Sequence, residues 1–179
     1  MQRRTAVKYL FVVAAGSAIV HSCLHNTDKA SVALKHLDIN AEQEKLLTEI
    51  AETIIPGGAA PGAKDTYAHL FVLKMVDDCY EEQQQKTFLV GLKEIDDFAK
   101  QKSGTSFLKC TNQQRNEIVN LLEDKKASGN AVQCYQIIKS LAIQGYLTSK
   151  PVLLDIFKYE LVPGRYNGFF PVKKIVHQA

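Results

Sequence analysis

The proline- and glycine-rich stretch Glu52–Asp65 is the feature that most constrains how this chain can fold. Pro56 has no backbone N–H and its ring clashes with the preceding turn, so a helix that contains Ile54 and Ile55 must end there. Because both isoleucines require burial, the stretch predicts a defined bend between two helices and not a flexible linker. Taken alone, it is a plain helix–helix connection. Four further residues restrict or permit backbone angles within it: Gly57, Gly58, Pro61 and Gly62.

Apolar residues recur at helical spacing on both sides of this bend, and no segment alternates with a period of two. The fold class that we predict is therefore all-α, a compact bundle of about five to six helices with an irregular C-terminal tail from Val162. Asp38 or Asn40 is the expected N-cap of the first helix, and Thr111 with Gln114 has the spacing of a capping box. The expected helices cover residues 41–55, 64–80, 82–100, a segment from 111, 131–147, and a short last helix capped by Ser149.

Residues 1–22 have the composition of an export signal. Arg3, Arg4 and Lys8 precede an apolar run, Tyr9–Val20, of 12 residues, whereas a helix that spans a bilayer needs about 20. A basic start, a short apolar middle and small residues at the end are typical of a signal peptide. The paired arginines favour the twin-arginine route, which carries folded proteins, and the general secretory route remains the alternative.

Cys23 follows this run and is a candidate for lipidation. Val20 at the third position before it and Ser22 just before it resemble a bacterial lipobox. If Cys23 is acylated, the protein is held on a membrane without spanning it, in the periplasm or cell envelope. The alternative is cleavage nearby, with Cys23 left as an ordinary thiol. We therefore divide the chain into a signal peptide (1–22), a mostly polar tether (23–37) and a helical domain (38–179).

The charge balance of the body argues against nucleic acid as a partner. The chain has 22 Lys and Arg against 19 Asp and Glu, but three of the cations are Arg3, Arg4 and Lys8 in the signal. The remaining body is neutral, so it has no basic surplus that would attract phosphate backbones. Acidic pairs such as Asp77-Asp78 are expected to lie on solvated faces.

The sequence contains no pattern that carries chemistry by itself. The five histidines form no Glu-x-x-His pair, and no nucleotide-binding glycine loop or nucleophile elbow is present. Cys79, Cys110 and Cys134 are too widely spaced for a local metal site, although in an oxidising compartment they allow one disulfide. We therefore expect no catalytic, metal or cofactor-binding residues in this chain.

Several short motifs, in order, resemble the small subunit (subunit 3) family of gluconate 2-dehydrogenase and related membrane-bound, FAD-dependent sugar dehydrogenases. The resemblance begins with the paired arginines and covers most of the mature chain. The other matching motifs are Glu52-Thr-Ile-Ile-Pro56, Pro61-Gly-Ala-Lys-Asp65, Met75-Val-Asp-Asp-Cys-Tyr80, Gly145-Tyr-Leu-Thr-Ser149, Tyr159 and Val162-Pro-Gly-Arg-Tyr166.

The resemblance implies a noncatalytic subunit that assists the folding, export and membrane association of a flavoprotein. The large subunit would hold FAD and oxidise the sugar or polyol, and a cytochrome c subunit is a further possible partner. A stand-alone exported lipoprotein that acts as a binding module is the alternative. The candidates for the partner interface are Ile55, Pro56, Pro61, Gly62, Tyr146, Ser149, Pro163, Gly164 and Tyr166.

Overall fold

The structure, a computed structural model, describes residues 29–162, 164 and 169. These residues form helices and no strand, which confirms the predicted all-α class. The only pairing of extended backbone among them is an isolated bridge between Lys29 and Asn40. The elements are α2 (Ala41–Ile54), α3 (Ala68–Cys79), α4 (Glu82–Ser103), the 3-10 turn η1 (Phe107–Lys109), α5 (Asn112–Glu123), α6 (Gly129–Leu147) and the π-helical turn η2 (Val152–Ile156).

Helix starts follow the capping chemistry of the sequence. Asn40 and Gln43 form a capping box at the start of α2, and Thr111 and Gln114 form one at the start of α5, as expected. The side chain of Ser128 caps α6, which begins at Gly129 and not at Ala131. The predicted boundaries are therefore right to within a few residues at these points.

Two starts differ from expectation. The helix predicted from Lys64 begins only at Ala68, because Tyr67 adopts the left-handed conformation with φ 53° and interrupts it. The last helix is a single π turn, and Ser149 does not cap it. Its hydroxyl instead donates to the carbonyl of Tyr146, 2.7 Å away, in the end of α6.

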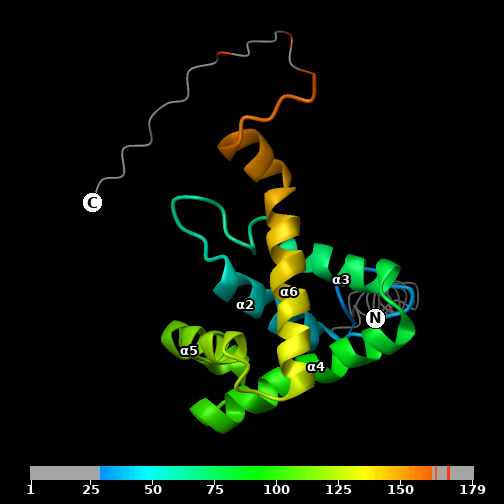
Figure 1. The fold of residues 1–179 in the computed structure, drawn as a ribbon, viewed down its shortest axis with the longest axis vertical. Helices are drawn as coiled ribbons and strands as arrows, with labels where there is room; N and C mark the ends of the chain where they lie inside the picture. The colour runs from blue at the N-terminus through cyan, green and yellow to red at the C-terminus, as the bar shows by residue number, and fades with distance from the viewer. Residues whose placement is uncertain (1–28, 163, 165–168, 170–179) are drawn as a thin grey trace, which may run out of the picture.

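Helix α6 is the axis of the molecule and packs chiefly on α4 and α3 (Figure 1). Two glycines permit the close approach at these crossings. A Cβ on Gly91 of α4 would lie 2.4 Å from the carbonyl oxygen of Asn130, and one on Gly145 of α6 would lie 2.8 Å from the Cβ of Phe71. Since real Cβ atoms do not approach so closely, only glycine allows these two crossings.

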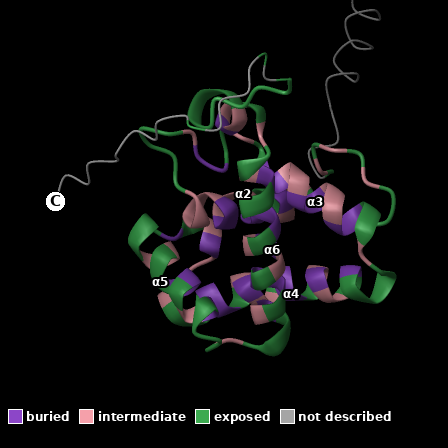
Figure 2. Ribbon diagram, turned by 45° about the horizontal axis from the view of Figure 1, so that its top comes forward, coloured by how far each residue is buried: buried purple, intermediate pink, exposed green. Residues whose placement is uncertain are grey.

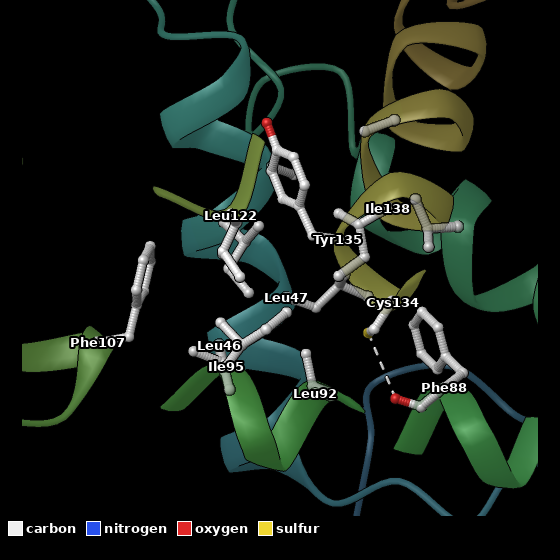
Figure 3. Close-up of a cluster of buried hydrophobic side chains, with 14 of the residues drawn as sticks. Leu46, Leu47, Phe88, Leu92, Ile95, Phe107, Leu122, Cys134, Tyr135 and Ile138 are labelled. Carbon is white, nitrogen blue, oxygen red and sulfur yellow. Dashed lines mark hydrogen bonds between the residues drawn. The ribbon is translucent and has the colours of Figure 1, made fainter. Parts of the chain in front are cut away.

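The core lies where α2, α3, α4, α5 and α6 meet, and Figure 3 shows a part of it. Phe107, which follows the break after α4, is buried in this core. Asp96 holds this break in place, because its carboxylate accepts the N–H of Phe107 at 2.9 Å and the hydroxyl of Ser106 at 2.7 Å. Cys134 donates to the carbonyl of Phe88 at 3.4 Å (Figure 3).

The described part of the predicted tether, residues 29–37, lies against the body. Leu37 and the following Ile39 are buried in the core. Asp77 of α3, which the sequence placed on a solvated face, is 1% exposed and accepts backbone N–H groups of this segment. The prediction for Asp77 was wrong because the N-terminal segment covers it, whereas its neighbour Asp78 is exposed.

Glu44 of α2 holds the start of the same segment. Its carboxylate accepts the N–H of Ser31 at 2.6 Å and also the hydroxyl of Ser31. Nε2 of the buried His69 lies 3.8 Å from the same carboxylate. Burial lowers the pKa of His69, although the charge of Glu44 opposes that shift.

Within the described residues, no helix has both the length and the apolar character needed to cross a bilayer.

Candidate partner interface

The bend after α2 is closed by the side chain of Glu52. Its two carboxylate oxygens accept the N–H of Gly57 at 3.0 Å and the N–H of Lys64 at 2.9 Å, which join the two ends of the bend. The N–H of Ala63 also donates to the carbonyl of Ile55 at 2.9 Å. The bend is therefore a fixed loop, as the sequence predicted.

Gly62 is buried at the base of this loop. A Cβ at this position would lie 2.4 Å from the backbone nitrogen of Gly57, so no larger residue fits. The N–H of Gly62 donates to the carboxylate of Asp65 at 2.8 Å. The crown of the loop, from Pro56 to Ala60, is exposed, while Pro61 and Ile55 are half-buried.

Tyr67, next to this loop, combines strain with exposure. It holds a left-handed φ of 53° and is 65% exposed, beside the ring of His69 with the centroids 6.3 Å apart. A non-glycine residue in this region costs roughly 1 kcal/mol. Tyr67 was not among the predicted residues, because nothing in its residue type signals a positive φ.

The end of α6 carries the second group of predicted residues. Gly145 is buried against Phe71, whereas Tyr146 and Ser149 are half-buried. In both views the loop 56–62 and the end of α6 lie at the same end of the molecule (Figures 1 and 2). The two groups of predicted residues, about 90 positions apart in sequence, are thus brought to one end of the bundle.

Exposed apolar side chains concentrate at the same end. Eight of the large hydrophobic residues with substantial exposure fall between Ile143 and Val162, and only Tyr67, Val90 and Phe169 lie elsewhere in the described chain. Soluble domains rarely expose so many neighbouring apolar side chains unless they form an interaction surface. The eight residues are Ile143, Leu147, Leu154, Ile156, Phe157, Tyr159, Leu161 and Val162.

The remaining predicted residues are less informative. Gly164 is exposed, and a Cβ there would meet no atom within 4 Å. Pro163 and Tyr166 lie outside the described residues. The export and lipidation candidates also lie outside them: Arg3, Arg4, Lys8 and Cys23.

The ionic cluster beside the loop has a structural role. Arg115 of α5 donates to the carbonyls of Phe107 at 3.2 Å and Leu108 at 2.9 Å, and it pairs with Glu49. Lys64 lies 2.8 Å from the same Glu49. Burial alone would raise the pKa of Glu49, but Lys64 and Arg115 lower it below its ordinary value. The two cations thus share one carboxylate, and the cluster borders a cleft of about 320 Å³.

No described part of the chain brings three or more His, Cys, Asp or Glu side chains into a metal-binding group. The three described cysteines are free thiols, with Cys110 and Cys134 buried and Cys79 exposed, so the disulfide that the sequence allowed among them is not formed. Burial, and to a lesser degree the charge of Glu94, raises the pKa of the Cys134 thiol well above its ordinary value. A raised pKa makes Cys134 a poor nucleophile.

Comparison with known proteins gives one match. A family model described as gluconate 2-dehydrogenase subunit 3 matches residues 41–164, more than two thirds of the chain. The chain matches no curated protein and no solved structure. The matched range begins at the first residue of α2 and continues past the last helical turn, so it contains both the loop and the exposed apolar end.

Proposed function

This chain belongs to the gluconate 2-dehydrogenase subunit 3 family, and on that premise we propose that it is the noncatalytic small subunit of an FAD-dependent sugar or polyol dehydrogenase that faces the periplasm. Membership makes it a subunit of a multi-subunit dehydrogenase complex. Its proposed role is to assist the folding, twin-arginine export and membrane association of the flavoprotein subunit. A cytochrome c subunit is a further proposed partner.

The observation that carries this proposal is the exposed apolar end of the molecule. Residues between Ile143 and Val162 present large hydrophobic side chains to solvent, close to the rigid loop that Glu52 closes. Such a surface is costly for an isolated protein and suits a stable contact with another chain. It therefore supports a subunit role over that of a free-standing module.

The geometry of the loop does not favour a bound cofactor phosphate, which agrees with the proposal that the partner holds FAD. A glycine-rich loop before a helix can hold a phosphate through its backbone N–H groups. In this loop those groups are already used, since Glu52 accepts from Gly57 and Lys64, and Asp65 accepts from Gly62. The carboxylates also place negative charge where a phosphate of FAD would sit, so this loop does not suit that cofactor.

The N-terminal segment supplies the proposed route to the membrane. Arg3, Arg4 and Lys8 would direct export of the folded complex, and acylated Cys23 would hold it at the periplasmic membrane surface. The described segment from Lys29 is fastened to α2 and α3 through Glu44 and Asp77. A short chain would therefore connect the anchor to a firmly attached point on the body.

The decisive experiment is affinity purification of the tagged full-length protein from gently solubilised native membranes, with a visible spectrum and mass spectrometry of the eluate. We expect a flavin spectrum and a large flavoprotein in fixed ratio. Dye-linked oxidation assays would then identify the sugar. A colourless protein that elutes alone would instead support the alternative, a stand-alone exported lipoprotein acting as a binding module.

A matched pair of signal variants tests the export role. Replacing Arg3 and Arg4 together by lysine should leave the flavoprotein subunit in the cytoplasm, because twin-arginine recognition requires the arginines. Replacing Lys8 by arginine preserves the charge and should leave export intact. Normal export of the flavoprotein in the double variant would remove the signal-sharing part of the proposal.

A further inference from the structure

The family match extends beyond the packed core. Its last residue is Gly164, whereas the last buried residue in the described chain is Val152. Residues 153–162, the C-terminal arm, are thus part of the pattern that defines the family but contribute no buried side chain to this domain. A segment that belongs to the family pattern without serving the core is best explained by the property the family shares, which is assembly into a complex.

The start of the arm has a defined geometry. The N–H of Phe157 donates to the carbonyl of Val152 at 3.0 Å, and the N–H of Tyr159 donates to the carbonyl of Leu153 at 2.8 Å. Lys158 between them holds a left-handed φ of 52° and turns the chain out of the π turn. The arm therefore leaves the end of α6 in a set direction, away from the helices of the bundle (Figure 1).

The side chains of the arm are large, apolar and exposed. Phe157 and Tyr159 are 56% and 50% exposed, and Leu161 and Val162 are each 83% exposed. Aromatic side chains such as those of Phe157 and Tyr159 are enriched in protein interfaces, and tyrosine is among the residues that most often supply a large share of the binding energy. Water is thus a poor environment for this segment, and an apolar groove is a suitable one.

The charge of the arm indicates which kind of surface it binds. It contains Asp155 and Glu160 against the single cation Lys158. A segment that binds an anionic bilayer carries an excess of lysine and arginine, and this arm has an excess of acid. A protein groove is therefore favoured over a lipid surface.

We propose that the C-terminal arm docks into an apolar groove of the flavoprotein subunit, with Phe157, Tyr159 and Leu161 as its anchors. This inference rests on the proposed function and specifies where that subunit binds. The exposed crown of the loop at Pro56–Ala60 lies at the same end of the molecule (Figure 1).

The test compares Leu161→Glu with Val90→Glu in the tagged full-length protein, expressed in the native host and purified from solubilised membranes. Val90 is also exposed, at 47%, but lies on α4 away from the arm. Each eluate is assayed for flavin absorbance per mole of tagged chain and for thermal unfolding. We expect at least a tenfold loss of flavin for Leu161→Glu, none for Val90→Glu, and equal unfolding temperatures, since neither side chain is in the core.

Each other outcome overturns a different statement. If the wild-type and Leu161→Glu proteins carry equal flavin, docking through the arm is refuted and the proposed function is unaffected. A wild-type protein without flavin would refute the proposed function, and the arm assignment with it. A wild-type homodimer that dissociates in the Leu161→Glu variant would show that the arm binds a second copy of this chain. Loss of membrane retention with flavin still bound would show that the arm binds a lipid surface.

Discussion

The carboxylate of Asp77 accepts the backbone N–H of Leu37 at 2.9 Å, across 40 residues of sequence. The same carboxylate accepts the N–H groups of Lys35 at 2.8 Å and His36 at 2.7 Å. Burial alone would raise the pKa of Asp77, but these three donors and the charge of Lys74 lower it to about 2. One side chain of α3 therefore fastens the N-terminal segment to the body, and it does so only while ionised.

Replacing Asp77 by asparagine should lower the free energy of unfolding by about 2 kcal/mol, because an amide cannot accept all three donors. The folded pKa lies below the ordinary value of 3.8. The stabilisation is therefore present above about pH 4 and is lost as the pH falls towards 2. Denaturant unfolding at a series of pH values should show a shallower acid limb for the variant.

Asp78→Asn is the matched control for this prediction. Asp78 is the adjacent carboxylate, but it is exposed and forms only surface ion pairs with Lys35 and Lys74. Such pairs contribute about 0–1 kcal/mol. Equal losses for the two variants would contradict the fastening role of Asp77.

The loop after α2 gives a second prediction from two glycines in one turn. A Cβ on Gly62 would lie 2.4 Å from the nitrogen of Gly57, whereas a Cβ on Gly58 would meet nothing within 4 Å. Gly62→Ala should therefore destabilise the protein by about 1–3 kcal/mol, while Gly58→Ala should have little effect. Thermal unfolding of both variants tests this difference. A Gly62→Ala protein as stable as the Gly58→Ala protein would show that the loop can rearrange to accommodate the added Cβ.

Much of the fold could be predicted from local chemistry. The capping boxes at Asn40 and Thr111, the break at Gly104 and the burial of Phe107 all follow from residue types at fixed spacing. The bend at Pro56 was predicted for the same reason. These features depend on neighbours within a few residues, which a sequence displays directly.

The features that were missed depend on distant contacts. Asp77 looked like part of a solvated pair, since nothing near it in sequence shows that residues 35–37 cover it. Tyr67 gives no signal for a left-handed φ. Leu154 and Phe157 look like core residues of a short helix, yet both are exposed. The motifs of the sequence thus nominated candidates for the interface, but they did not indicate the exposed residues of the arm.

The guanidinium of Arg115 is the subject of a third prediction. It joins α5 to the carbonyls of Phe107 and Leu108 and to Glu49 of α2. A lysine keeps the charge but cannot reproduce these diverging hydrogen bonds, so Arg115→Lys should cost about 1–2 kcal/mol of stability. Lys126→Gln, which removes an exposed pair with Asp124, is the control and should cost little. An Arg115→Lys variant as stable as the wild type would show that the positive charge alone is sufficient for the stability that Arg115 provides.

The cysteines give the last prediction, which concerns the reactivity of their thiols. Cys79 is exposed, whereas Cys110 and Cys134 are buried, and burial raises the pKa of the Cys134 thiol. Because the thiolate is the reactive form, brief alkylation of the native protein should label Cys79 and spare the two buried cysteines. Peptide mapping by mass spectrometry reads out the labelling.

Full unfolding before alkylation provides the control, since all three cysteines should then react. Cys79→Ser should leave the native protein almost unlabelled at these positions. Rapid native labelling of Cys134 would contradict the packing of α6 on α4, where its thiol donates to the carbonyl of Phe88. A peptide that links two of the three cysteines in the protein isolated from membranes would contradict the free-thiol state, because Cys110 and Cys134 would have to leave the core to form it.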